Sequence, residues 1–214
     1  MKVKYNVYSM IFLLVFLVAG CGKLGVNRTI QIADGERYKG DLNSVNGAII
    51  IGKNCEIIGS CHAINGAIEV KDSAIVHSLL AVNGSISIGE GVKILGEAST
   101  VNGSIQFQKG VSVKDEVSTI NGDIEMNNTT IEYNVTTING DISLRNKSVI
   151  EGDIVIRARR GYAENTKPLL IMINDSSLVQ GDIINRDKNR SVKLILASGG
   201  RVAGQIREIE VTRQ

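Results

Sequence analysis

Tryptophan is absent from this chain of 214 residues, and only five tyrosines and three phenylalanines are present. A bulky globular core usually depends on aromatic side chains for much of its volume. The apolar residues here are mostly small or β-branched, which suits a thin, regular and layered core. This scarcity therefore favours a layered β-structure over a bulky globular one.

An excess of charge of one sign is also lacking. The formal net charge is +2, and Lys2 and Lys4 lie in a segment that we expect to be removed. Without them, the basic residues equal the 22 acidic residues in number. The chain also lacks the basic and aromatic pattern of a nucleic-acid binder. We therefore expect no nucleic-acid partner.

Signals for catalysis are few. His62 and His77 are the only histidines, and no segment of the GxSxG type accompanies them. Asp123 and Asp141 fall at equivalent positions of the repeat described below, where paired carboxylates could serve glycoside hydrolysis or hold Ca²⁺. We interpret them as solvated surface carboxylates, because no glycine-rich calcium-binding nonapeptide occurs. The sequence therefore predicts no enzyme activity, no cofactor and no metal.

The N-terminus has the features of an export signal. Two lysines precede the unbroken apolar run 11–18, which is too short to span a bilayer, since that takes roughly 20 residues. The segment Val18–Cys21 resembles the lipobox of bacterial lipoproteins, in which the cysteine is acylated. The resemblance implies a signal peptide over 1–20, lipidation at Cys21, a tether over 21–29 and a membrane partner through the lipid. The alternative is an ordinary signal peptide.

The residue after the cysteine bears on location. Gly22 stands where the resemblance would place Asp in a lipoprotein retained at the inner membrane. In a bacterium with two membranes, this favours the outer membrane.

A repeat dominates the rest of the chain. Six Asn-Gly pairs occur at steps of 19, 18, 19, 19 and 18 residues, beginning at Asn46 and ending at Asn139. Both residues tolerate positive φ, and stacked asparagine side chains can bond one another. A series of hairpins would not need a constant period, and no helical period of 3.6 appears. The pattern predicts a parallel β-helix, in which like residues stack about 4.8 Å apart.

Alignment on the Asn-Gly pairs gives five apolar columns. The first places Ile75 beside Ile57 and Ile94. The third contains the residues that precede the pairs, namely Val45, Ile64, Val82, Val101, Ile120 and Ile138. We predict an all-β fold, a single-stranded parallel β-helix of about nine coils over residues 30–214, and we favour the right-handed form.

The repeat continues beyond residue 152, but it changes. Residues 157–168 and 185–191 replace the Asn-Gly bend as longer polar loops, which should emerge as neighbours on one edge. Departures from a regular repeat commonly mark a binding face. A cationic cluster in these loops could bind an anionic glycan, lipid headgroup or protein, and the alternative is that it is merely solvated. The candidate residues are Arg157, Arg159, Arg160, Lys167, Arg186, Lys188 and Arg190.

Two further cysteines follow the export signal. Cys61 falls in an apolar column, where a free cysteine packs as a small hydrophobe. A Cys55–Cys61 disulfide is the alternative, since an exported protein enters a disulfide-permissive space.

The coils resemble the β-helix of bactofilins, a family of polymer-forming cytoskeletal proteins with Gly-Asp-Ile steps. The matching segments are Gly40–Leu42, Gly152–Ile154 and Gly181–Ile183, and runs such as Thr100–Ile105 are similar to envelope lipoproteins and adhesins with β-strand repeats. Bactofilins are generally cytoplasmic, whereas this chain has an export signal. The resemblance implies a non-enzymatic envelope scaffold that self-associates or binds a surface. The alternative is a protein that binds or degrades polysaccharide.

Overall fold

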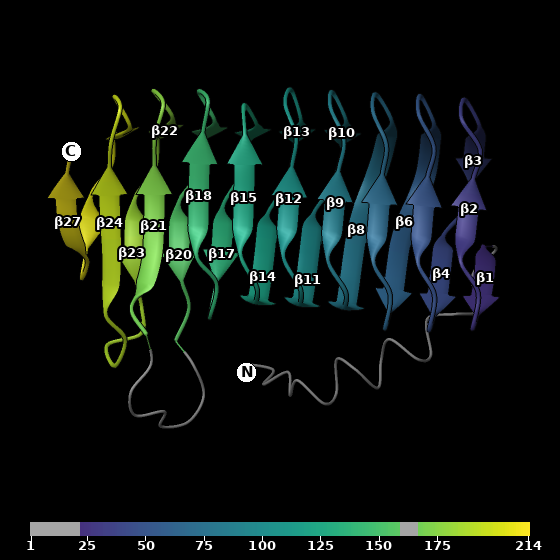
Figure 1. Cartoon of the computed structure of the whole chain (residues 1–214), viewed down its shortest axis with the longest axis horizontal. Coiled ribbons are helices and arrows are strands. Elements are labelled where there is room, and N and C mark those ends of the chain that lie inside the picture. Colours follow the sequence, from purple (N-terminus) through teal and green to yellow (C-terminus); the bar gives the residue numbers. More distant parts are fainter. Residues whose placement is uncertain (1–21, 159–166) are drawn as a thin grey trace, which may run out of the picture.

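The computed structural model describes residues 22–158 and 167–214 and confirms the parallel β-solenoid (Figure 1). Every paired strand is parallel to its neighbour in the next coil, and the described residues contain no helix. A ten-stranded sheet receives one strand from each coil, so the chain makes about ten turns, close to the nine predicted.

Each regular coil contributes one strand to each of three faces of the solenoid. Face 1 contains the strands before a bend: β3 (Arg37–Lys39), the first parts of β6 (Glu56–Ile64) and β8 (Ile75–Asn83), β10 (Lys93–Ile94), β13 (Ser112–Val113), β16 (Thr130–Ile131), β19 (Val149–Ile150), β22 (Leu178–Val179) and β25 (Arg201–Val202). Face 2 contains the strands after that bend: β1 (Lys23–Val26), β4 (Leu42–Val45), the second parts of β6 and β8, β11 (Ala98–Asn102), β14 (Val117–Asn121), β17 (Val135–Thr137), β20 (Ile154–Ile156), β23 (Ile183–Asn185) and β26 (Ile206–Arg207).

Face 3 is the ten-stranded sheet, whose strands lie side by side along the long axis in Figure 1. Its strands are β2 (Ile30–Ile32), β5 (Ile49–Ile51), β7 (Ile68–Val70), β9 (Ile86–Ile88), β12 (Ile105–Phe107), β15 (Ile124–Asn127), β18 (Ile142–Arg145), β21 (Leu169–Ile173), β24 (Val192–Leu196) and β27 (Glu210–Arg213).

The core lies between the three faces and consists of stacked aliphatic side chains. On face 3, Ile49 pairs with Ile68 and Ile68 pairs with Ile86, and all three are fully buried. Alternate residues of a strand point to opposite sides, so each short strand places its first and third side chains inward. The repeat of branched aliphatic residues therefore fills the interior coil by coil.

The third apolar column predicted from the sequence does not belong to the core. Val45 and its equivalents are half-exposed, because they point outward from face 2. Small residues one position earlier point inward instead, and they are all buried: Ser44, Ala63, Ala81, Thr100, Thr119 and Thr137. Strand alternation thus overrides side-chain hydrophobicity at this face.

The placement of Ile75 in the first column is also wrong. Val76, the next residue, pairs with Ile57 and Ile94, and it is fully buried while Ile75 is half-exposed. This coil is one residue short, and the register shifts between Ile57 and Ser60 to absorb the difference. The shortening falls at the bend, where it leaves both flanking strands in register.

The solenoid begins earlier than the sequence predicts. Lys23–Val26, expected within the tether, forms β1 and pairs with β4 over four residues. The first 21 residues, which include the predicted signal peptide and Cys21, lie outside the described residues. The two predicted loops fall between β20 and β21 and between β23 and β24, and residues 159–166 of the first loop lie outside the described residues.

Close coil stacking explains the glycine of the Asn-Gly pairs. A methyl group at Gly84 would collide with the carbonyl oxygen of Gly66 in the preceding coil, and Gly66 stands in the same relation to Gly47. Positive φ is a lesser reason, because among the glycines of these pairs only Gly122 adopts it. The glycine column therefore exists because no side chain fits between the coils there.

We predict that Gly84→Ala destabilises the solenoid by about 1–3 kcal/mol, the usual penalty for overpacking. Gly91→Asn is the control, because Gly91 is exposed, its added Cβ meets only a side-chain oxygen at 3.8 Å, and asparagine tolerates its positive φ. Denaturant unfolding of both variants measures the difference. Equal unfolding midpoints would contradict the stacking explanation.

Candidate functional site

A continuous ladder of asparagine side chains runs along the edge between faces 2 and 3. The Nδ2 group of each asparagine donates to the Oδ1 atom of its equivalent in the preceding coil, at 2.7–3.0 Å. The ladder comprises Asn27, Asn46, Asn65, Asn83, Asn102, Asn121 and Asn139. The direction of donation leaves the Oδ1 atom of the last member, Asn139, to accept from another group.

That group is Arg190, from the loop between β23 and β24. Its Nη1 atom donates to Asn139 Oδ1 at 2.7 Å and to the carbonyl oxygen of Ile138 at 2.8 Å. The loop is fixed from within, because Asn185 Nδ2 donates to the Arg190 carbonyl oxygen and Asn185 Oδ1 accepts from the Asp187 amide. Arg190 therefore terminates the ladder from 51 residues away.

The other cationic residues of the predicted cluster do not share one environment. Arg157 reaches back across face 2 to Glu116, with Nη2 and Oε1 2.9 Å apart. Lys167, Arg186 and Lys188 are exposed. Arg159 and Arg160 lie outside the described residues, and anion binding by the whole cluster stays a prediction. Two members thus have structural partners, and three exposed cations remain near the loops.

Face 2 is covered where β17 and β20 lie. Thr136 and Val155 point outward from β17 and β20, yet they are only 3% and 7% exposed. In this region Arg157 extends to Glu116, and Arg190 extends to Asn139. Sequence reasoning missed these two contacts, because no local signal links residues 41 and 51 positions apart.

The remaining part of face 2, nearer the N-terminus, is open and carries no charged outward side chain. Its outward residues are Leu24 and Val26 on β1, Asn43 and Val45 on β4, His62 and Ile64 on β6, Leu80 and Val82 on β8, Ser99 and Val101 on β11, and Ser118 and Ile120 on β14. Faces 1 and 3 differ, since they carry outward charges such as Lys93, Glu69 and Glu125.

The carboxylates that stack in the repeat serve the backbone. Asp123 Oδ1 accepts from the Asp141 amide at 2.8 Å, and Asp141 Oδ1 accepts from the Leu170 amide at 2.7 Å. In the Gly-Asp-Ile steps, Asp153 and Asp182 make the equivalent bond to the next coil, each at 2.8 Å. These residues hold coils together, which explains why they recur.

A small acidic group lies at the bend beside face 2. Partial burial raises the pKa of the Glu97 carboxyl, and the nearby charges of Asp115 and Glu116 raise it further. No group of three or more His, Cys, Asp or Glu side chains within the described ranges could hold a metal ion.

Cys55 and Cys61 are both free and buried. Cys55 donates from its thiol to the Ala33 carbonyl oxygen, with an S–O distance of 2.9 Å. Cys61 stacks between Leu42 and Leu79, and burial raises the pKa of its thiol to about 12. Of the two alternatives, the structure contains the packed thiols and not a disulfide.

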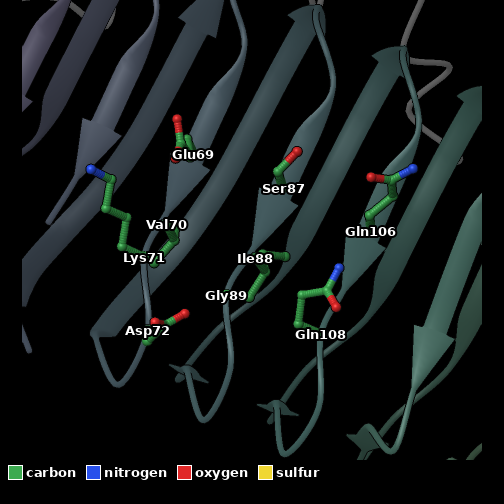
Figure 2. A pocket seen from close by; sticks show the side chains of 9 residues that line it. All are labelled: Glu69, Val70, Lys71, Asp72, Ser87, Ile88, Gly89, Gln106 and Gln108. Atoms are coloured by element: carbon green, nitrogen blue, oxygen red, sulfur yellow. The ribbon is translucent and has the colours of Figure 1, made fainter. Parts of the chain in front are cut away.

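Two adjoining hollows form a shallow polar groove across face 3. Their volumes are about 190 and 210 Å³, and both are lined by Gln106 and Gln108. Figure 2 shows Glu69, Ser87 and Gln106 at equivalent positions of β7, β9 and β12, directed away from the core. Amide, hydroxyl and carboxylate groups in a row can exchange hydrogen bonds with a polyhydroxylated ligand.

No protein family, curated protein or solved structure matches the chain. In the part of the chain that the structure describes, no helix is long and apolar enough to cross a membrane.

We predict that Arg190→Ala lowers the free energy of unfolding by about 1–2 kcal/mol, because it removes two hydrogen bonds and leaves the last ladder amide without its cap. Arg186→Ala removes an equal charge from the same loop and should change stability by less than about 0.5 kcal/mol. Denaturant unfolding compares the two variants. Equal losses would show that Arg190 does not terminate the ladder.

We predict that the free energy of unfolding depends on pH through His62. Burial lowers the pKa of His62 below its ordinary value of 6.5, against the opposing charge of Asp41, and its Nδ1 atom lies 3.0 Å from Asn43 Oδ1. The unfolded chain therefore binds a proton at this residue more readily than the folded chain does. The contribution of His62 to stability is full above pH 6.5 and declines as the pH falls below it.

The test is the unfolding free energy between pH 7.5 and 5, which should decline less in His62→Gln than in the unaltered chain. His77→Gln is the matched variant, because it removes the other histidine and keeps the decline due to His62. An identical decline in His62→Gln and His77→Gln would contradict this assignment.

Proposed function

We propose that this chain is a non-enzymatic lipoprotein of the bacterial cell envelope, whose solenoid is a rigid scaffold that self-associates or presents a binding surface. The anchor is an acylated Cys21, and the outer membrane is its location in a bacterium with two membranes. In this proposal the chain is an exported counterpart of the bactofilin-like or adhesin-like scaffolds that its repeats resemble.

The observation that carries the proposal is the closeness of the first strand to the lipobox. β1 begins at Lys23, two residues after Cys21. A chain spans at most about 3.5 Å per residue, so a lipid on Cys21 would hold the first coil within about 10 Å of the membrane surface. Multiple acyl chains give stable anchoring where one does not. A rod of about ten stacked coils would then project from a fixed base.

The carboxylates support a structural role over a catalytic one. Asp123 and Asp141 each commit one oxygen to a backbone amide of the next coil. A glycosidase needs one carboxyl group as the proton donor and a second as nucleophile or base. The polysaccharide-binding alternative is favoured by one observation, the polar groove lined by Gln106 and Gln108.

The full chain produced in a two-membrane bacterium should begin at an acylated Cys21 and fractionate with the outer membrane. Mass spectrometry of the mature N-terminus and membrane fractionation measure both properties. Cys21→Ser is the control and should lose the lipid and leave the membrane fraction. An intact N-terminus, or cleavage without lipid, would contradict the lipoprotein proposal.

The same Cys21→Ser chain tests the absence of catalysis on a panel of acidic and neutral polysaccharides. No turnover is expected. Turnover that disappears in Asp123→Asn would overturn the non-enzymatic proposal, whereas binding without turnover that Gln106→Ala weakens would favour the alternative.

A further inference from the structure

The open part of face 2 extends over six successive coils and has two outward rows, one aliphatic and one that mixes leucine with Asn43, His62, Ser99 and Ser118. It comprises the outward side chains of β1, β4, β6, β8, β11 and β14, and none of them is charged. One row consists only of valine and isoleucine, half-exposed from Val45 to Ile120, and Val26 extends it at 54% exposure. Leu24 adds a second apolar side chain at the same end, 41% exposed. This is the open apolar surface nearest to Cys21 in sequence.

The asparagine ladder borders this row, and its side-chain amides already bond one another. Each inner amide already donates to the preceding coil and accepts from the following one, as Asn83 does with Asn65 and Asn102. Further along face 2, the outward Thr136 of β17 and Val155 of β20 are buried, in the region where Arg157 and Arg190 make their contacts. The chain itself therefore covers face 2 at β17 and β20 and leaves the strands nearer to Cys21 in sequence open.

We propose that the open part of face 2 packs against the same surface of a second copy of this chain. A second copy offers the same row with the same coil spacing, so the side chains can interdigitate along the whole length, as they do between packed sheets. A twofold contact requires a self-complementary patch, and an uncharged periodic row meets that condition.

The orientation of the pair rests on the proposed function. If both copies are anchored at Cys21, both rods start at the membrane and run parallel, with the twofold axis along the rods. Packing then begins at Leu24 and Val26 and ends before Arg157, where the covered part of the face begins.

The area of the open part of face 2 determines how strongly two copies pair. Six coils spaced about 4.8 Å apart and four residues of about 3.3 Å give roughly 400 Å² on each copy. The total of roughly 800 Å² is below the 1,200–2,000 Å² of stable complexes. We therefore expect weak pairing in dilute solution and efficient pairing where anchoring on one membrane raises the effective concentration.

Crosslinking on a membrane tests the pairing. Residues 22–214 with an N-terminal histidine tag are bound to phosphatidylcholine vesicles that contain a nickel-chelating lipid. Ser99→Cys places a thiol on face 2, and Ser87→Cys places one on face 3 as the matched control. A short bis-maleimide should crosslink Ser99→Cys into dimers about tenfold more than Ser87→Cys on vesicles, with little dimer from either in dilute solution.

Charge substitutions test the surface itself. Val82→Lys with Ile120→Lys, in the Ser99→Cys chain, should abolish the dimer, whereas Ser87→Lys with Gln106→Lys on face 3 should preserve it. Unfolding midpoints of both double variants show whether the solenoid is intact. The face 3 pair also keeps the added charge equal.

Three other results of the crosslinking experiment would each contradict pairing through face 2, and they can be told apart. Equal crosslinking of Ser99→Cys and Ser87→Cys would mean that copies associate through another surface, so self-association would stand and face 2 would not be its site. No dimer from either thiol would remove self-association. Protection of Ser99→Cys by vesicles without dimer would mean that face 2 lies on the bilayer. None of these results changes the acylation assay, which tests the lipoprotein proposal separately.

Discussion

The spacing between coils, about 4.8 Å in parallel sheets, is the constraint on which the rest of this structure depends. At that distance each side chain has its own equivalent as its nearest neighbour, above and below. A residue type can recur at equivalent positions of successive coils only if its side chains pack against, or hydrogen-bond with, one another. Isoleucine on face 3 does so by contact, as Ile49, Ile68 and Ile86 show. Asparagine does so by donating in one direction along the ladder, and glycine does so because nothing larger fits.

The same constraint determines how the regular part of the solenoid ends. A one-directional ladder leaves an acceptor at its last member, and Arg190 supplies the donor for Asn139. At the C-terminal end of face 3, the charged side chains of β27 (Glu210–Arg213) are exposed on the last strand, a feature that discourages further strand pairing. The open part of face 2, in contrast, carries no outward charged side chain. Its outward valines and isoleucines are therefore the feature that internal packing alone does not explain.

The repeat could be predicted from the sequence because it is local and periodic. The period, the parallel stacking, the Asn-Gly bend and both polar loops follow from spacing alone. The inward direction of Ser44 was missed because the more hydrophobic neighbour, Val45, was taken as the core residue. The start at Lys23 had a signal, since Val26-Asn27 precedes Val45-Asn46 by 19 residues. The contacts of Arg157 and Arg190 had none, because they join residues 41 and more positions apart.

In-register stacking of the coils is the central claim, and a distance between spin labels tests it most directly. Gln31 and Ser143 occupy equivalent outward positions of β2 and β18 on face 3, six coils apart. Labels on Gln31→Cys and Ser143→Cys, with Cys21, Cys55 and Cys61 replaced by alanine, are measured by pulsed electron paramagnetic resonance. Stacking predicts a single narrow distance near 29 Å, from six steps of about 4.8 Å. A broad distribution, or a distance that differs by a coil spacing or more, would contradict the account.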